Sequence, residues 1–138
     1  MSADAHGEII IDKEIDIIVV RKTVRDVAAK LNFGITDVTR IVTAASELAR
    51  NVFLYAGSGV MKWRVLNSSV AVGMELIFID HGPGIADLEQ VMHEGYSSSG
   101  GLGLGLPGSR RLMDELEITS QVGKGTTVTI KKWRRRYQ

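Results

Sequence analysis

Hydrophobic residues recur at helical spacing in two long segments of the first half of the chain. Residues 14–32 carry one apolar stripe that most charged side chains avoid; its members are Ile17, Val20, Val24, Val27, Ala28 and Leu31. A second stripe follows Thr36 and Asp37, which suit a helix start, and consists of Val38, Ile41, Val42, Ala45, Leu48, Ala49 and Val52. This spacing predicts two amphipathic helices that each bury one face.

The remaining apolar segments are shorter and fit β-strands. We predict five strands, over residues 8–12, 60–66, 70–80, 117–121 and 126–133. Residues 67–69 form the expected hairpin turn between the second strand and the third, and residues 122–125 join the last two. The run Leu76–Ile79 is apolar throughout, which is typical of a central strand covered on both faces.

Between the third strand and the fourth, the sequence predicts two helices and one irregular loop. Residues 86–93 fit a short helix, whereas residues 95–105 hold too much glycine for regular structure. Pro107 is tolerated in the first turn of a helix, and we expect that helix over Ser109–Leu116, with Leu116 turned inward. Helices grouped between hairpins predict an α+β two-layer sandwich, in which a mixed β-sheet carries its helices on one face.

The composition narrows the classes of protein. A chain of 138 residues, 44% of them hydrophobic, is long enough for a folded core, and we expect residues 1–138 to form a single domain. The absence of cysteine excludes disulfides, thiolate zinc sites and a cysteine nucleophile. No apolar run has the length of a membrane span and the first residues lack a signal-peptide pattern, so we expect a soluble cytoplasmic protein without a membrane partner.

Charge gives little support for nucleic-acid binding. The formal net charge is +1, and the three histidines lack metal-ligand spacing. Residues 131–137 combine cations with aromatics, but no recognition fold accompanies them, so we expect no nucleic acid partner. A solvated strand end and a docking site for an acidic protein are both open interpretations of this basic segment.

Glu47 and Asn51 are the first candidates for chemistry. They stand four residues apart on the second predicted helix, so their side chains share a face beside its apolar stripe. A carboxylate and a carboxamide at the edge of a core need polar partners, which a metal ion and a polar ligand supply. For this pair taken alone, the alternative is a solvated pair on the helix surface.

The segment Asp80–Ile85 directly follows the strand that we predict to be central. Its aspartate is therefore half desolvated, and the carboxylate can accept hydrogen bonds from an exocyclic amino group of a ligand. Gly82 and Gly84 carry no side chains, so a flat ring can lie against the backbone. The alternative is a turn in which Asp80 bonds its own backbone, which is common after strands.

A glycine run precedes the helix that Pro107 begins. It consists of Gly100, Gly101, Leu102, Gly103, Leu104 and Gly105. The backbone N–H groups of such a loop can hold phosphate oxygens, and the following helix N-terminus favours an anion. The run is not a Walker A loop, since no Lys-Ser or Lys-Thr follows, and it does not follow the first strand of a βαβ unit as a dinucleotide fingerprint does. Its leucines favour a ligand-ordered lid over a flexible surface loop.

Taken together, these motifs resemble the Bergerat-type ATP-binding fold shared by gyrase, Hsp90, histidine kinases and MutL. Glu47 and Asn51 match the N box, Asp80–Ile85 matches the G1 box, the glycine run matches the G2 box, and a Gly-Thr pair ends the series at residues 125–126. The resemblance covers nearly the whole chain, and its four parts are specific in combination although each is weak alone. Residues 46–51, 80–85 and 101–108 further resemble the small anti-sigma and switch protein kinases.

The resemblance implies an ATP site formed by Asn51, Asp80, Gly82, Gly84, Ile85, residues 100–105 and Thr126. Asp80 would bind the adenine amino group, and Thr126 would assist near the base. Asn51 would coordinate a Mg²⁺ ion that bridges the phosphates. Glu47 would be the general base toward a serine or threonine hydroxyl, in a reaction that depends mostly on positioning and charge neutralisation.

The function implied by the resemblance is an ATP- and Mg²⁺-dependent serine/threonine protein kinase. Its substrates would be STAS-domain scaffold proteins of a stressosome, and by partner switching it would then bind a downstream regulator, for example of phosphatase type. A second interpretation is an anti-sigma-like module that binds ATP and sequesters partners without catalysis, in which Glu47 need not be a base. A third is an ATPase of the gyrase or Hsp90 kind, which would need a coupled transducer domain.

Overall fold

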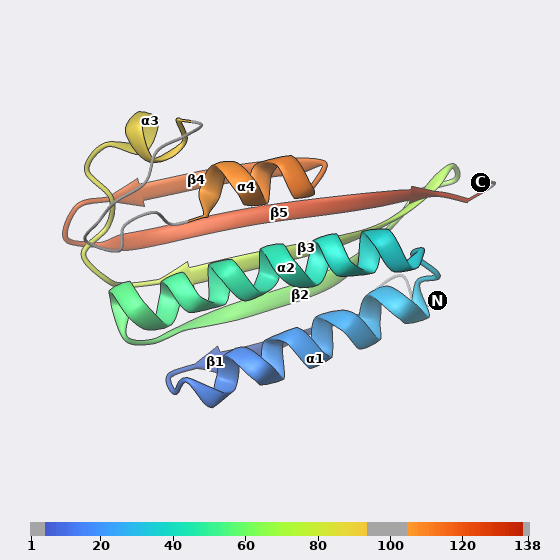
Figure 1. Cartoon of the computed structure of the whole chain (residues 1–138), viewed down its shortest axis with the longest axis horizontal. Coiled ribbons are helices and arrows are strands. Elements are labelled where there is room, and N and C mark those ends of the chain that lie inside the picture. The colour runs from blue at the N-terminus through green and yellow to red at the C-terminus, as the bar shows by residue number, and fades with distance from the viewer. Residues whose placement is uncertain (1–4, 94–104, 137–138) are drawn as a thin grey trace.

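The computed structural model describes residues 5–93 and 105–136, and Figure 1 shows two layers, a β-sheet and a set of helices on one of its faces. In chain order the elements are β1 (His6–Ile11), α1 (Ile15–Lys30), α2 (Ile35–Asn51), the π-helix η2 (Val52–Ala56), β2 (Gly59–Asn67), β3 (Ala71–Asp80), α3 (Leu88–Val91), α4 (Leu106–Leu112), β4 (Glu115–Gln121) and β5 (Gly125–Arg135). The predicted α+β two-layer class, with helices on one face, is confirmed.

The five strands are ordered β1-β2-β3-β5-β4, with β3 at the centre. The expectation of a mixed sheet was wrong, because every described pair of strands is antiparallel. Two hairpins form the β2–β3 and β4–β5 pairs, and β5 joins the two hairpins by pairing with β3. The register then places Asp80, the last residue of β3, opposite Thr126 of β5 and Gly59 of β2.

The two apolar stripes predicted from the sequence form the contact between the layers. The buried residues are Ile17, Val20, Val24 and Ala28 in α1 and Ile41, Val42, Ala44, Ala45, Leu48 and Ala49 in α2. They belong to one core with the sheet residues Met61, Met74, Leu76, Phe78, Val128 and Ile130. Each buried valine, leucine, isoleucine, methionine or phenylalanine contributes roughly 1.5–3 kcal/mol, and the small alanines let α2 pack closely on the sheet.

The opposite face of the sheet is not covered by the described helices, which all lie on the core side (Figure 1). Leu76 and Phe78 are buried, but Ile77 and Ile79 alternate to the open face and are only half-buried. The sequence interpretation that both faces of this strand are covered was therefore wrong. On the open face the buried Glu75 carboxylate accepts from Arg64 Nε at 2.5 Å, which raises the pKa of the Arg64 guanidinium.

The helix after the glycine run differs from its predicted bounds. α4 starts at Leu106 and ends at Leu112, so Leu116, expected in this helix, lies in β4. Backbone bonding explains the early end, because the N–H of Asp114 donates to the Lys131 carbonyl at 3.0 Å and so joins the chain to β5. Among the described helices, none is long and apolar enough to cross a membrane.

Candidate functional site

A cavity of about 140 Å³ lies between the second half of α2 and the point where the end of β3 meets the start of β5. It is lined by Leu48, Asn51, Val52, Tyr55, Phe78, Asp80, Pro83, Gly84, Ile85, Leu106, Ile118, Thr126 and Val128. An apolar lining with a few polar groups is the usual form of a small-molecule site. Five residues named from the sequence thus meet in one cavity: Asn51, Asp80, Gly84, Ile85 and Thr126.

Asp80 both forms a turn and lines the cavity. Its Oδ1 accepts the backbone N–H of Gly82 at 2.9 Å, which is the local turn considered as the alternative interpretation of this motif. The two interpretations are compatible, because a carboxylate has two oxygens and several lone pairs. One oxygen holds the turn, and the carboxylate keeps acceptor capacity toward the cavity.

A pair of hydroxyls continues the polar wall beside Asp80. Ser120 Oγ lies 2.8 Å from Thr126 Oγ1, donates to the carbonyl of Gly125 at 3.1 Å, and accepts the N–H of Ile85 at 2.7 Å. Either hydroxyl can be the donor of the Ser120–Thr126 bond. When Ser120 gives its one proton to the Gly125 carbonyl, Thr126 donates to Ser120. In both arrangements the Thr126 oxygen keeps a lone pair that can accept from a ligand in the cavity, as the Asp80 carboxylate can.

Ser120 was missed by the sequence interpretation. The available signal was the alternation of β4, since Leu116, Ile118 and Ser120 fall on one face of that strand and Ser120 is its only polar member. A hydroxyl at the end of a row of inward-facing apolar side chains indicates that the strand passes from the hydrophobic core to a polar site.

The turn after Asp80 packs closely against neighbouring backbone. Gly84 has a φ of +77°, and a Cβ there would collide with the carbonyl oxygen of Gln121 at the end of β4. The N–H of Gly123 also donates to the Pro83 carbonyl at 2.8 Å, so this turn and the β4–β5 turn support each other. Gly82 does not line the cavity and instead leaves room for Ala56 of η2.

The wall opposite the sheet is the junction of α2 and η2. Leu48, Asn51, Val52 and Tyr55 line the cavity from successive turns. The π-helix was not indicated by any sequence pattern; such wide turns are rare and are found frequently at functional sites. It ends at Gly57, whose φ is 82°.

Glu47 lies outside the cavity, one helical turn before Asn51. It is exposed and lines a separate cleft with Arg21, Thr43 and Ser46. At the start of α4, Gly105 has a φ of +68°, and a Cβ there would lie 3.0 Å from Glu47 Oε1. Glu47 is therefore next to the end of the glycine run, although residues 100–104 of that run lie outside the described residues.

No group of three His, Cys, Asp or Glu side chains in residues 5–93 and 105–136 is arranged to hold a metal ion. Asn51 offers a carboxamide oxygen, which is a suitable ligand for Mg²⁺. Magnesium sites beside phosphates commonly take one or two protein ligands and complete their shell with phosphate oxygens and water. The described residues therefore fit Mg²⁺ only as a partner of a bound phosphate chain.

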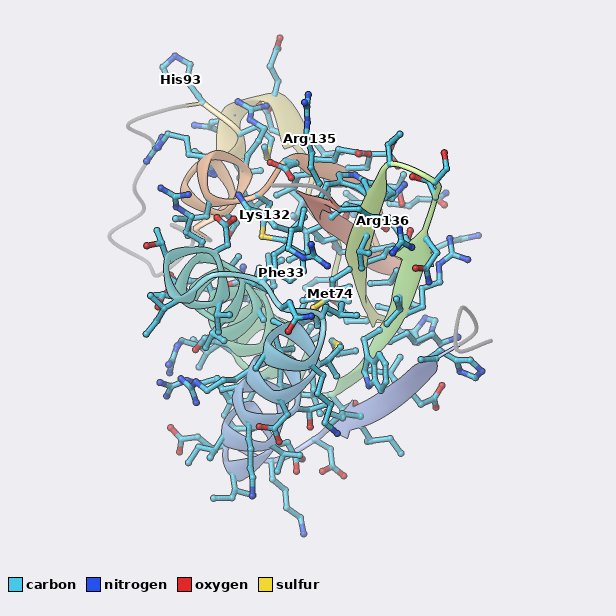
Figure 2. All side chains as sticks on the ribbon, turned by 90° about the vertical axis from the view of Figure 1, so that its right-hand side faces the viewer. Phe33, Met74, His93, Lys132, Arg135 and Arg136 are labelled. Carbon is cyan, nitrogen blue, oxygen red and sulfur yellow. The ribbon has the colours of Figure 1, made fainter. Side chains whose placement is uncertain are left out.

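The basic end of β5 is bonded within the protein. Its interactions join Lys131 to Glu75 and Glu115, Lys132 to Asp37 and Asp114, Arg134 to the Leu31 carbonyl, and Arg136 to Ser68 and Asn67. Figure 2 shows Lys132 on the helix side of the sheet and Arg136 beside the β2–β3 hairpin. Lys132 is buried and these bonded cations have structural partners, whereas Arg135 and Arg136 are exposed, so the solvated strand end considered from the sequence describes only the last residues of the segment.

Comparison with known proteins identifies the family. The profile of the histidine kinase-, DNA gyrase B- and HSP90-like ATPases matches residues 36–136. The chain belongs to this family. It is 48% identical over 122 residues to the serine/threonine-protein kinase RsbT of Bacillus subtilis (strain 168), covering 88% of this chain and 92% of RsbT. It is also 31% identical over 119 residues to the anti-sigma F factor of Thermoanaerobacter sp. (strain X514), covering 82% of each.

Solved structures of this ATPase family share the fold. The RsbU and RsbW domains of a Mycobacterium tuberculosis protein superpose with a TM-score of 0.63 at 20% identity, covering 95% of this chain and 32% of that one. The catalytic domain of the histidine kinase ThkA superposes with a TM-score of 0.54 at 17% identity, covering 93% and 97%. The ATPase fold expected from the motifs is thereby confirmed, and the family is one whose members use ATP.

Proposed function

We propose that this protein is an RsbT-type serine/threonine-protein kinase that binds Mg²⁺-ATP and phosphorylates a STAS-domain scaffold protein. After phosphorylation it would leave the scaffold and bind a downstream regulator, for example of phosphatase type. The proposal is supported by 48% identity to RsbT over most of both chains. The single structural observation that carries it is the cavity in which Asp80 and Thr126 both present acceptors to a ligand.

Two neighbouring acceptors suit adenine. The exocyclic amino group of adenine has two N–H donors, whereas a 6-oxo purine such as guanine or hypoxanthine has a carbonyl at that place and would meet acceptor with acceptor. Phe78, Ile85 and Val128 supply apolar surface for the faces of the ring. The cavity therefore favours ATP over GTP or ITP through its hydrogen-bond pattern.

The phosphate chain would run along α2 from Asn51 toward Glu47. Four residues of helix span about 6 Å, which is close to the length of the outer phosphates. Asn51 is the residue that would hold Mg²⁺, and the ion would supply positive charge to the phosphate oxygens. Gly105, at the start of α4, lies beside Glu47. The end of the glycine run would therefore approach the terminal phosphate.

Glu47 is suited to act as the general base. Its exposed carboxylate faces the cleft with Arg21, Thr43 and Ser46, where a protein substrate can approach from solvent. It would accept the proton of the serine or threonine hydroxyl as that oxygen attacks the γ-phosphorus and the bond to ADP breaks. Phosphorylation then adds about −1.5 to −2 of charge to the scaffold; next to the Glu47 carboxylate this charge would weaken the complex and release the kinase.

The test is phosphate transfer from labelled ATP to recombinant single-domain STAS proteins, with and without Mg²⁺. Wild type should transfer label to a serine or threonine, and Glu47→Gln should reduce the rate by about 10²–10⁴-fold while ATP affinity changes little. Glu89→Gln is the matched control, because Glu89 is an exposed carboxylate on α3 that does not line the cavity. Transfer by Glu47→Gln at the wild-type rate would reject the base assignment.

The anti-sigma F factors among the relatives support a second candidate, a module that sequesters a partner and uses ATP as a structural ligand. Sizing chromatography separates the two candidates. A kinase should leave the STAS protein when Mg²⁺-ATP is added, and Glu47→Gln should stay bound. Release of the wild-type protein without phosphate on the scaffold would favour the sequestering module.

A further inference from the structure

Lys132 is the only buried cation among the described residues. Its Nζ donates to the carbonyl oxygen of Leu112 at 2.9 Å and lies 3.7 Å from Asp37 Oδ1 and 3.6 Å from Asp114 Oδ1. Leu112 is the last residue of α4, Asp37 lies in the first turn of α2, and Asp114 immediately precedes β4. One ammonium group of β5 therefore joins the C-terminal end of α4 to α2 and β4 (Figure 2).

A buried charge is costly unless it is paired, and an apolar residue of similar size often serves stability as well or better. Lys132 faces the core beside Met74, its partner across the strands. Of its three partners, only the Leu112 carbonyl belongs to α4, while Asp37 and Asp114 balance the charge of the ammonium group that holds this carbonyl. The Leu112 carbonyl belongs to the last turn of that helix, where carbonyls lack helical partners and a cation is favourable.

α4 is seven residues long, and Arg111 of this helix also takes part in an interaction. The inward Ser109 hydroxyl, in contrast, is buried without a hydrogen-bond partner among the described residues. The first end of α4 is the functional one, since Leu106 lines the cavity and Gly105 abuts Glu47. A helix of this length is a stiff element of about 10 Å, so a shift at Leu112 moves the opposite end as well.

We propose that Lys132 is a positioning residue for phosphate transfer. It holds the far end of α4, and thereby sets Gly105 and Leu106 at the correct place beside Glu47 and the cavity. Lys132 touches neither nucleotide nor substrate. This role rests on the proposed kinase function, because it concerns the geometry in which Glu47 meets the terminal phosphate.

Lys132→Met tests the role, because methionine fills the buried stem and removes the charge and the donor. Asp37 and Asp114 keep 34% and 43% of their side-chain surface exposed, so this change leaves no carboxylate buried and unpaired. Lys131→Met is the matched control. Lys131 is the adjacent cation on the opposite face of β5, where it lies 3.8 Å from Glu75 and 3.7 Å from Glu115 and does not contact α4.

Three quantities are measured for both variants: kcat for transfer to the STAS protein, the Kd for ADP, and hydrogen exchange at the Ser109 and Met113 amides. The Ser109 N–H donates to the Gly105 carbonyl and the Met113 N–H donates to the Ser109 carbonyl, so both amides report on α4. Lys132→Met should lower kcat at least tenfold, since misplacement by about 1 Å costs up to 10²-fold. It should leave the ADP Kd within threefold of wild type and speed exchange at both amides. Lys131→Met should change none of the three.

A Lys132→Met protein with wild-type kcat would overturn the proposal, and so would equal losses of kcat and ADP affinity, which indicate a general structural role. If Lys132→Met does not fold, Asp114→Asn decides, because asparagine can still accept the Trp133 N–H that Asp114 Oδ2 accepts at 2.7 Å. It should lower kcat about threefold, and no loss would overturn the proposal. If wild type transfers no phosphate, the kinase function fails instead. Unchanged hydrogen exchange at the Ser109 and Met113 amides of Lys132→Met would then independently reject the idea that Lys132 holds the end of α4.

Discussion

Replacing Asp80 with asparagine keeps the size of the side chain but replaces the hydrogen-bond acceptor that faces the cavity with a donor. In the native turn Asp80 Oδ1 accepts the N–H of Gly82 at 2.9 Å. Asparagine would keep that bond through its single oxygen and would turn its NH₂ group toward the cavity. An adenine amino group would then meet a donor in place of an acceptor.

The loss can be estimated from the bond that disappears. A hydrogen bond to a charged acceptor contributes about 1.5–3 kcal/mol, so the Kd for ATP should rise by about 10- to 150-fold. ITP carries a carbonyl where ATP carries the amino group, and it should gain from the new donor. We therefore expect Asp80→Asn to reverse the preference of the site, from ATP over ITP to ITP over ATP.

Calorimetric titration of both nucleotides measures this, with circular dichroism to confirm that the variant is folded. Asp87→Asn is the matched control, because Asp87 is an exposed aspartate that accepts the N–H of Gln90 at 2.9 Å and does not line the cavity. It should leave both affinities unchanged. A folded Asp80→Asn protein that binds ATP within twofold of wild type would refute the reasoning about the adenine amino group.

Four further outcomes follow from the geometry. Gly84→Ala should lower the free energy of unfolding by at least about 1–3 kcal/mol, because alanine is strained at a φ of +77° and its Cβ would collide with the Gln121 carbonyl oxygen. A urea midpoint equal to wild type would contradict this. Asn51→Ala should weaken ATP binding with Mg²⁺ more than without it; equal losses in the two titrations would remove Asn51 from the metal site. Gly105→Val, with its φ of +68° beside Glu47, should weaken ATP binding more than ADP binding, and matching effects would place the loop elsewhere. The backbone N–H of Asp12 donates to the Asp16 carboxylate and lowers its pKa. The ionised carboxylate therefore stabilises the fold above the unfolded-state pKa, and this contribution is lost as pH falls through the pKa of the folded state. Asp16→Asn should have a lower melting temperature than wild type at neutral pH, and the difference should vanish in strong acid.

The layers of the fold were predictable because burial on one face imposes a period on the sequence. Val20 and Leu48 belong to stripes that repeat every three to four residues, and the structure buries both. Asn51, Asp80 and Thr126 were predictable for another reason, since each has a fixed place in a motif next to a recognisable helix or strand. Their meeting in one cavity required only that β3 pair with β5.

Other features depend on contacts that a local pattern does not contain. Leu116 continues the apolar spacing of α4, yet it lies in β4 because the backbone of Asp114 is already bonded to β5. Ile77 and Ile79 are as apolar as Leu76 and Phe78, but the described helices cover only one side of their strand. Ser120 gains its importance from three partners in β5 and the turn after β3, none of which its own segment reveals.

The place of β5 in the sheet constrains how the chain assembles during synthesis. β5 is the last described strand to leave the ribosome, yet it lies between β3 and β4. Until it emerges, β4 lacks the partner it has in the finished sheet, and the central strand β3 keeps one edge open. Open edges beside apolar residues pair readily with other chains. Because Asp80 meets Thr126 only through β5, a nascent or truncated chain that stops before residue 125 has neither a closed sheet nor the complete cavity, and its open strand edges are exposed to aggregation until β5 emerges.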